Sequence, residues 1–316
     1  MNKEYRPLVS IIIPVYNGGN YLKLAIESAL AQTYKNIEVL VINDGSTDND
    51  TRKIALSYGD KIRYFEKENG GVSSALNYGI TLMNGEWFSW LSHDDEYFPD
   101  KIEKQIKLVR TINESDVDRT LIYSSFVLID SNGNEIITRN KNCNKKFEGK
   151  EMFEYVLKKH FTLCGLSLLI PKRLFEKYGL FDLNYKYIQD EKMWHTFMLN
   201  DAKFLCSNDI IAKSRVHGEQ VTVKKHELYY KEMEIYAGEL YNYFVFDFKN
   251  LKKQFIQYYY FLEFSNFSVL AKRYEDYLKI NKEYRFRICI NKIILKTKGI
   301  FFRIIRWIYK KIIKKI

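Results

Sequence analysis

Two adjacent carboxylates, Asp94 and Asp95, come shortly after an apolar run that ends at Leu91. Acids side by side at the edge of a sheet repel each other unless a positive group lies near them. A cation such as Mg²⁺ or Mn²⁺ would relieve this repulsion, since it takes one or two carboxylates and completes its shell with phosphate oxygens and water. On the pair alone, the plainer interpretation is a solvated acidic turn before a helix that Pro99 begins, where acids suit the helix dipole.

A second group of candidates could hold a nucleotide. Tyr16 offers a flat ring on which a base could stack, an interaction of about 1–3 kcal/mol, although a loop aromatic would look the same. Asp44 ends another apolar run, where its carboxylate could accept the imide N–H of uracil or cap a helix. Gly45 and the pair Gly70 and Gly71 permit tight turns. The sequence has no GxGxxG fingerprint of dinucleotide binding.

The spacing of the apolar residues predicts the elements that position these side chains. Between residues 8 and 90, short β-branched runs alternate with helical periodicity, which is typical of βαβ units and a parallel sheet. We expect strands at Val9–Val15, Ile37–Ile42, Ile62–Phe65 and Trp87–Leu91, and helices at Tyr21–Ala31, Lys53–Tyr58 and Val72–Met83. Each expected strand ends in a polar loop, so the candidates should meet at the carboxyl edge of the sheet, where ligands of open α/β folds bind.

The pattern changes after residue 120. Leu121–Ile129 and Glu135–Thr138 flank an Asn-Gly dipeptide, which predicts a hairpin. The elements expected next are a strand at Leu166–Ile170, a helix at Asp190–Leu199 and a strand at Lys203–Ala212. Beyond Lys224 the chain predicts helices rich in Tyr, Phe and Lys.

Several motifs, in order, resemble those of glycosyltransferase family 2. They are Val9-Ser-Ile-Ile-Ile-Pro-Val-Tyr-Asn17, Ala29-Leu-Ala-Gln-Thr-Tyr34, Val41-Ile-Asn-Asp-Gly-Ser-Thr-Asp48, Asn69-Gly-Gly-Val-Ser-Ser-Ala-Leu-Asn77, Leu91-Ser-His-Asp-Asp95, Gly179-Leu-Phe-Asp182, Gln189-Asp190 with Trp194, and Arg215-Val-His-Gly-Glu-Gln220. The resemblance covers roughly residues 8–222, and so many ordered motifs rarely arise by chance. It implies a GT-A fold, with a mostly parallel Rossmann-like sheet flanked by helices, and an inverting transfer of sugar from a nucleotide diphosphate.

The resemblance also implies roles for individual residues. The expected nucleotide-binding residues are Pro14, Tyr16, Asn17, Asp44, Gly71 and Asp94. The expected ligands of a Mn²⁺ or Mg²⁺ ion are Asp95, Asp94 and His217, with Asp95 the more direct ligand and Asp94 nearer the ribose. Glu191, Trp194 and Arg215 are expected near the acceptor or donor pocket, although a core tryptophan and an ordinary surface histidine are the alternatives for Trp194 and His217.

Asp190 matches the position of the family's general base. Transfer requires that a carboxylate remove the proton of the attacking hydroxyl, and a single displacement inverts the anomeric centre without an enzyme nucleophile. A helix N-cap is the alternative for Asp190, and Glu191 is the competing base. A retaining transferase or a nucleotidyltransferase on a similar sheet is less favoured, and an inactive scaffold or binding protein is the alternative from another class.

Four positions depart from the family pattern. Asn43 and Ser92 stand where acids are frequent, Leu76 stands where a basic residue is common, and Gln189 replaces the usual Glu. The carboxylates assigned to the metal and to the base are all retained, which argues against an inactive protein.

The basic charge is concentrated at the end of the chain. The formal net charge is +11, yet residues 224–316 hold 21 basic and 9 acidic residues, so the first 223 residues are close to neutral. Phe301, Ile305, Ile308, Ile312 and Ile316 form an apolar stripe at helical spacing, beside a stripe of Arg303, Arg306, Lys310 and Lys314. Such a helix can lie on an anionic membrane, and packing on protein is the alternative. Nucleic acid is not an expected partner, since phosphate binding does not need isoleucines.

We therefore expect a GT-A catalytic domain over residues 1–223, with a nucleotide-binding half at about 1–98 and an acceptor half at about 99–223. A basic helical extension over 224–316 would follow. Four scattered cysteines and the lack of a signal-peptide pattern or an apolar run of about 20 residues favour a cytoplasmic enzyme, peripheral on the inner face of the membrane. The expected partners are a nucleotide-sugar and a saccharide or lipid-linked acceptor, and self-association into a homo-oligomer stays open.

Overall fold

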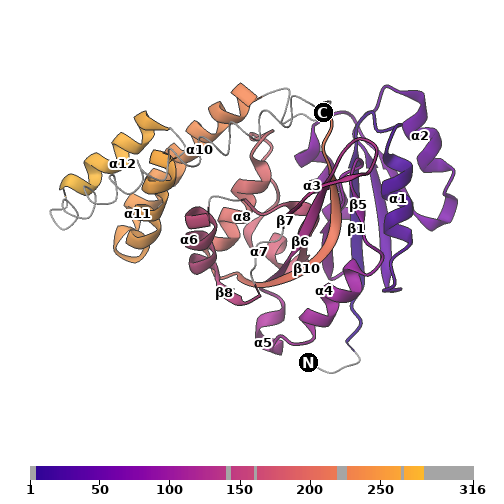
Figure 1. The fold of residues 1–316 in the computed structure, drawn as a ribbon, viewed down its shortest axis with the longest axis horizontal. Coiled ribbons are helices and arrows are strands. Elements are labelled where there is room, and N and C mark those ends of the chain that lie inside the picture. Colours follow the sequence, from indigo (N-terminus) through magenta and orange to yellow (C-terminus); the bar gives the residue numbers. More distant parts are fainter. Residues whose placement is uncertain (1–4, 140–143, 160–161, 219–225, 265–266, 281–316) are drawn as a thin grey trace. The chain divides into compact units, whose positions relative to one another are not determined.

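The computed structural model describes residues 5–139, 144–159, 162–218, 226–264 and 267–280 (Figure 1). The chain divides into two compact units. The first contains residues up to Phe153 and from Thr162 to Tyr229, and the second contains 154–161 and the residues from Tyr230 on. The boundary expected at residue 223 falls in the segment 219–225, outside the described residues, and stays a prediction.

The first unit is built on one sheet. Its strands are β1 (Val9–Val15), β2 (Ile37–Asn43), β3 (Arg63–Glu66), β4 (Trp87–Trp90), β5 (Glu96–Tyr97), β6 (Thr120–Ile129), β7 (Glu135–Arg139), β8 (Lys146–Glu148), β9 (Leu168–Pro171) and β10 (Lys203–Arg215). In the described part of the chain they join in the order β3-β2-β1-β4-β9-β6-β10-β5, with β7 beside β6 and β8 beside β10. The pairs among β1–β4 are parallel, as predicted. The second half is mixed, because β9 runs antiparallel between β4 and β6 while β6 and β10 are parallel.

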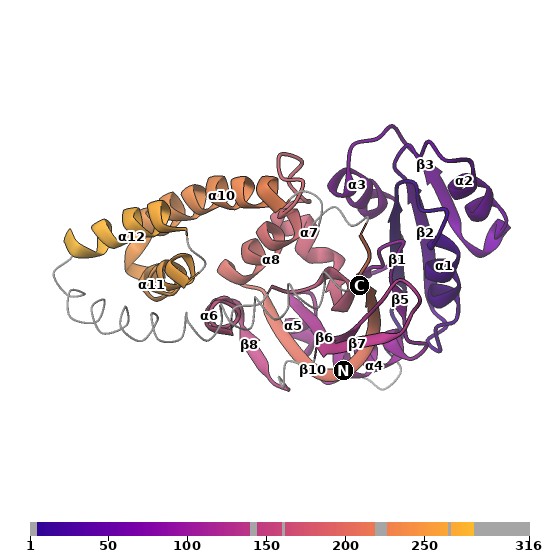
Figure 2. The ribbon, with the colours of Figure 1, turned by 45° about the horizontal axis from the view of Figure 1, so that its top comes forward.

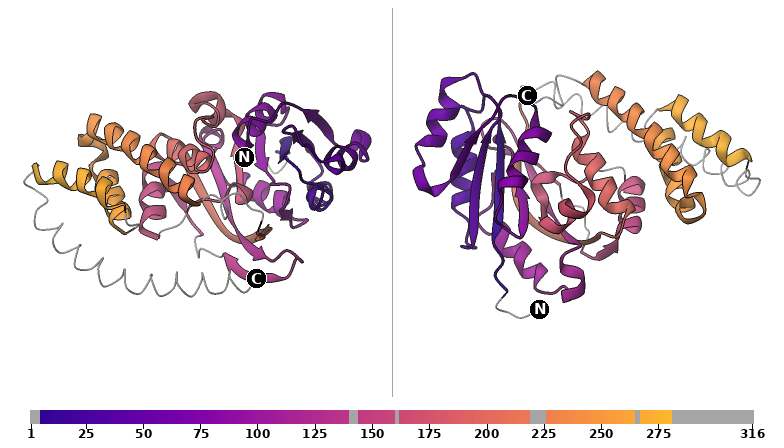
Figure 3. Two further views of the ribbon diagram at one scale, coloured as in Figure 1. Left: turned by 90° about the horizontal axis from the view of Figure 1, so that it is seen from above. Right: turned by 180° about the vertical axis from the view of Figure 1, so that it is seen from behind.

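Helices cover both faces of the first half of the sheet. The helices of this unit are α1 (Leu22–Leu30), α2 (Asn49–Leu56), α3 (Val72–Leu82), α4 (Lys101–Val109), α5 (Glu114–Val117), α6 (Gly149–Lys159, which continues into the second unit), α7 (Lys172–Tyr178) and α8 (Gln189–Leu199), with 3-10 turns at Gly59–Lys61 and Gly165–Ser167. Figures 2 and 3 show α1 and α2 on one side of β1–β3 and α3 on the other. This arrangement explains why β1 is almost entirely apolar, since Ile11 and Ile13 on one face and Ile12 on the other are all fully buried.

The predicted strands and helices of residues 8–90 are confirmed, with bounds that agree within two residues except at one start. Helix α2 begins at Asn49 rather than Lys53, because Asp48 caps it and its carboxylate accepts the backbone N–H of Thr51 at 3.1 Å. The hairpin of β6 and β7 is confirmed as well. Strand β9 begins later than predicted, since Leu166 lies in a 3-10 turn.

The described residues of the second unit beyond Tyr230 are mainly helical, as predicted for this part of the chain. Helices α10 (His226–Phe246), α11 (Phe248–Phe264) and α12 (Ser268–Ile280) supply most of it. Aromatic rings fill its interior: the ring centroid of Tyr274 lies 5.1 Å from that of Tyr241 and 4.7 Å from that of Phe255. Among the described helices, none has both the length and the apolar character needed to cross a membrane. The expected stripe from Phe301 to Ile316 lies outside the described residues.

Candidate active site

The loops that follow β1 and β2 are joined by one side chain. Asn17 adopts a left-handed backbone conformation with φ of 51°. From there its Oδ1 accepts the backbone N–H of Thr47 at 2.8 Å, and its own N–H donates to Ser46 Oγ at 2.9 Å. Asn17 therefore holds the two loops together and leaves the ring of Tyr16, next to it, 46% exposed. That open face suits the predicted stacking.

Asp44 holds the loop that follows β3. Its carboxylate is 3% exposed and accepts the backbone N–H groups of Gly70 and Gly71, the latter at 2.7 Å. The ammonium group of Lys67 lies 2.7 Å from Oδ1. Gly71 has φ of 84° and precedes α3, a conformation that favours glycine. Asp44 thus fixes the position of the Gly70–Gly71 turn, and both of its carboxylate oxygens already accept protein donors, so its predicted contact with a base stays a prediction.

Lys67 was not among the residues predicted from the sequence. A basic residue directly after β3, at the same sheet edge as Asp44, was the signal that could have found it. Together with the loop after β2, it lines a cavity of about 500 Å³ whose other charged walls include Arg52 and Glu66. Pro14, by contrast, is buried within β1, opposite Ile42 of β2. The side chain of Pro14 is therefore not open to a nucleotide, and a contact through its backbone stays a prediction.

Asp94 and His217 face each other at the end of β4. His217 Nε2 lies 3.0 Å from Asp94 Oδ2, and both side chains are largely enclosed, at 12% and 14% exposure. The ring of Tyr21 lies 5.4 Å from that of His217. A second imidazole that the sequence reasoning missed, His93, packs against Gly18 in the loop after β1, where a Cβ on Gly18 would lie 2.7 Å from the His93 ring. Burial lowers the pKa of His93.

Asp95 bonds to a different partner from Asp94. It is 7% exposed, and its Oδ1 accepts the backbone N–H of Arg215 at 2.8 Å. Burial, together with the neighbouring charge of Asp94, raises its pKa well above the usual value. The geometry does not favour the predicted ranking of the two acids: Asp94 is the carboxylate that faces the imidazole of His217, and Asp95 bonds to the end of β10.

Arg215 is also placed differently from the prediction. Its side chain is 2% exposed and bonded to protein groups, among them the carbonyl of Asp94 and the carboxylate of Glu96. A guanidinium enclosed in this way does not line a substrate pocket, so its role must be exerted through the groups it contacts.

The first turn of α8 carries the predicted base. Asp190 is half-buried, and its Oδ1 accepts the backbone N–H of Glu191 at 2.9 Å. Burial raises the pKa of Asp190 to about 6. Glu191 is buried, and burial together with the charge of Asp190 raises its pKa to about 8. Of the two acids, Asp190 is the more exposed and the more readily ionised.

Trp194, one turn further along α8, lies in the core. It is 1% exposed, and its ring centroid is 5.9 Å from that of Phe181 and 6.0 Å from that of Phe197. The aromatic cluster occupies its surfaces, so the structure contradicts a role as the wall of an acceptor pocket and supports the alternative of a core tryptophan.

The acids of β4 and α8 converge around the thiol of Cys164. Burial, with smaller contributions from the charges of Asp95, Asp190 and Asp94, raises the pKa of this thiol to about 12. An effect of all three charges on one thiol requires that they share a neighbourhood, although they lie about a hundred residues apart along the chain. Asp94, which faces His217, and Asp190 therefore both lie within electrostatic reach of the same thiol.

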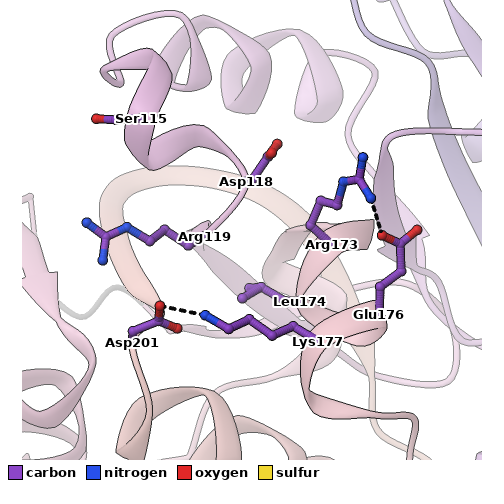
Figure 4. A pocket seen from close by; sticks show the side chains of 8 residues that line it. All are labelled: Ser115, Asp118, Arg119, Arg173, Leu174, Glu176, Lys177 and Asp201. Carbon is purple, nitrogen blue, oxygen red and sulfur yellow. Dashed lines mark hydrogen bonds and ion pairs between the residues drawn. The ribbon is translucent and has the colours of Figure 1, made fainter.

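Another cavity, of about 400 Å³, lies at the opposite edge (Figure 4). It is formed where β6 and β10 begin, between α5, α7 and Asp201. Its cations are paired within the protein: Arg173 bonds to Glu176 at 2.8 Å and Lys177 to Asp201 at 2.7 Å. None of the predicted site residues lines it.

The family model and the similar proteins both point to glycosyltransferases. The model of the family described as glycosyl transferase family 2 matches residues 10–179. An uncharacterized glycosyltransferase of Rickettsia typhi is 50% identical over 220 residues, which cover 69% of this chain and 67% of that protein. The hyaluronan synthase of Pasteurella multocida is 30% identical over 266 residues, which cover 82% of this chain but 25% of the synthase.

Solved structures with a similar fold include two transferases. S. aureus TarS 1–349 in complex with UDP-GlcNAc has a TM-score of 0.59 at 18% identity, covering 74% of this chain and 66% of TarS. The mannosyltransferase PcManGT of Pyrobaculum calidifontis, in complex with GDP-Man and Mn²⁺, has a TM-score of 0.51 at 17% identity, covering 68% and 59%. At such identities the similarity concerns the fold, which is the expected GT-A fold.

Proposed function

Since the chain belongs to glycosyltransferase family 2, we propose that it transfers a sugar from a UDP-sugar to a hydroxyl group of a glycan or lipid-linked saccharide, with inversion. The observation that carries the proposal is the contact of Asp94 with His217, 3.0 Å apart at the end of β4, with Asp190 close enough for its charge to act on the same Cys164 thiol. The Asp94–His217 pair suits a cation that holds the diphosphate of the donor, and Asp190 suits removal of the proton from the acceptor hydroxyl.

The nucleoside would lie on the loops after β1, β2 and β3. Tyr16 offers its exposed ring to the base, and Asp44 keeps the Gly70–Gly71 turn close to it. TarS has been solved with UDP and with UDP-GlcNAc, and PcManGT with GDP-Man, which supports a nucleotide-sugar as the donor. We favour uridine because an acid at the position of Asp44 suits the imide N–H of uracil, provided that the ammonium group of Lys67, which lies 2.7 Å from Oδ1, gives way to the base.

Asp94 and His217 fit a divalent cation. A carboxylate and an imidazole 3.0 Å apart are suitable ligands for Mn²⁺, and two protein ligands leave positions for diphosphate oxygens and water. The described residues contain no cluster of three or more His, Cys, Asp or Glu side chains suited to a metal, so the donor would have to supply part of the shell. When bound, the cation would neutralise the negative charge that develops on the leaving diphosphate.

Asp190 would act as the general base. The acceptor oxygen attacks the anomeric carbon, the bond from that carbon to the phosphate oxygen breaks, and the diphosphate leaves with the electron pair. The hydroxyl proton passes to the carboxylate of Asp190, which must therefore be ionised. Because bond formation and cleavage occur on opposite faces of the anomeric carbon, the configuration inverts.

A panel of UDP-, GDP- and dTDP-sugars with Mn²⁺ tests this function. We expect release of UDP from one UDP-sugar, faster with a saccharide acceptor, and tighter binding of UDP than of GDP or dTDP in isothermal titration. If the folded protein binds nucleotides but turns over no sugar with any acceptor, the scaffold alternative replaces the enzyme.

The pKa of Asp190 predicts a dependence of activity on pH. Since the base acts in its ionised form and burial raises its pKa to about 6, kcat/KM should fall about tenfold per pH unit below pH 6 and level off above it. Initial rates between pH 4.5 and 8.5, at saturating Mn²⁺, measure this profile. An inflection near 4, the ordinary value for an aspartate, would contradict a buried base.

The acceptor and the location of the enzyme are further parts of the proposal. A basic C-terminal segment suits an enzyme that extends lipid-linked glycans for the bacterial surface at the inner face of the membrane. Deletion of residues 285–316 is expected to abolish sedimentation with vesicles that contain anionic lipid. Full-length protein with neutral vesicles, and with anionic vesicles at high salt, provides the controls. Undiminished sedimentation of the truncated protein would contradict membrane binding by this segment.

A further inference from the structure

Arg215 joins three segments that are far apart in the sequence. Its guanidinium donates to the carbonyl of Asp94, to the carboxylate of Glu96 and to the carbonyls of Asp130 and Ser131. It also lies over the ring of Tyr21, 4.7 Å from the centroid. Because the side chain is only 2% exposed, these contacts fix a charged group that solvent barely reaches.

Two of its bonds hold the turn that carries the predicted metal ligand. The backbone N–H of Arg215 donates to Asp95 Oδ1 at 2.8 Å, and its Nε donates to the carbonyl of Asp94 at 3.0 Å. His217 lies two residues further along the same segment and faces Asp94 Oδ2. Arg215 thus fixes the backbone of Asp94 relative to the segment that supplies His217, and so determines the separation of the two ligands.

The other end of the guanidinium is anchored in the turn between β6 and β7. Its Nη1 lies 3.2 Å from the carbonyl oxygens of both Asp130 and Ser131. The turn is itself held by the carboxylate of Asp130, which accepts the backbone N–H groups of Asn132 and Asn134 at 2.8 and 2.9 Å. An exposed turn some 35 residues from the Asp94–Asp95 pair is therefore connected to it through one buried side chain.

We propose that Arg215 is a positioning residue for divalent-cation binding, and that the Asp130–Asn134 turn belongs to the same support. The inference rests on the proposed function, in which Asp94 and His217 hold the cation. The planar fork of arginine reaches Asp94, Glu96 and the turn at once, whereas the single ammonium of a lysine cannot. Loss of the guanidinium keeps Asp94 and His217 in the chain but lets the distance between their side chains vary, which weakens binding of the cation.

Binding of UDP with and without Mn²⁺, measured by isothermal titration, tests this inference. In the wild type, Mn²⁺ should tighten the binding of UDP. Arg215→Lys should reduce the Mn²⁺-dependent increase in UDP affinity by about 10-fold or more. Its affinity for UDP without metal should change by less than about twofold. Lys213→Met is the matched control, because Lys213 also bonds to Glu96, at 3.4 Å, but has no bond to the Asp94–Asp95 turn. It should leave both affinities unchanged within about twofold.

Asp130→Ala provides a second variant, in case Arg215→Lys does not fold. The substitution removes the bonds that hold the exposed turn and is expected to reduce the Mn²⁺-dependent gain several-fold. The inference is overturned if the folded Arg215→Lys variant, or Asp130→Ala in its place, shows the same Mn²⁺-dependent increase in UDP affinity as the wild type. If Mn²⁺ does not increase the UDP affinity of the wild type itself, the proposed metal dependence fails instead. The two failures are therefore distinguishable.

Discussion

Replacement of Asp190 by asparagine is expected to lower the turnover of sugar transfer by about 10³-fold, the contribution that a well-placed general base makes. The amide cannot accept the proton of the attacking hydroxyl. The variant should fold normally, because the amide oxygen can still accept the backbone N–H of Glu191, as Asp190 Oδ1 does at 2.9 Å. Rates with saturating donor and acceptor measure the loss, and isothermal titration should show unchanged binding of UDP.

Glu191→Gln is the matched control for this prediction. Glu191 is buried with a pKa raised to about 8, so at pH 7 it is largely protonated and a glutamine resembles its usual form. We expect a change in turnover of less than about fivefold. A large loss with Glu191→Gln and normal turnover with Asp190→Asn would assign the base to Glu191.

Replacement of Asp94 by asparagine should cost about 10²–10³-fold in kcat/KM, because a cation that stabilises the leaving diphosphate contributes several kcal/mol. Asparagine keeps the shape of Asp94 and removes the charge that faces His217 at 3.0 Å. The requirement for Mn²⁺ should shift to much higher concentration, which a titration of activity with the metal would show.

Asp95→Asn offers a direct comparison with Asp94→Asn. The Asp95 carboxylate is buried and its pKa is raised, and an amide oxygen can still accept the backbone N–H of Arg215. We therefore expect less than about a tenfold loss. An equal or larger loss with Asp95→Asn than with Asp94→Asn would restore Asp95 as the ligand, as the sequence alone suggested.

The first half of the fold could be predicted because its signals are local. Strand β1 is almost entirely apolar since both of its faces are covered, and the alternation with helices implies the parallel sheet. The mixed half of the sheet was harder to predict from the sequence. The antiparallel insertion of β9 between β4 and β6 depends on pairings across about 50 to 80 residues, which no local pattern records.

The site shows the same distinction. The family motifs identified Asp94, Asp190 and His217, but the direction of a side chain depends on its three-dimensional surroundings. Asp94 lies in a turn in which the backbone N–H of Asp95 donates to the carbonyl of Ser92, and no local pattern records which of two neighbouring turn residues faces His217, so Asp94 and Asp95 could be found together but not ranked. Arg215 follows a strand at the polar end of the sheet and resembled a substrate contact. Its actual partners, Asp94, Glu96 and Asp130, lie 85 to 121 residues away.

The bonds of Asn17 and Asp44 have a consequence for how the donor would bind. Asn17 joins the loops after β1 and β2, and Asp44 joins the loop after β2 to the Gly70–Gly71 turn. The protein's own groups therefore order the nucleotide-facing loops during folding, before any donor arrives. Association of UDP should then occur in a single fast step without a slow rearrangement, and its affinity should carry little entropic penalty from ordering these three loops.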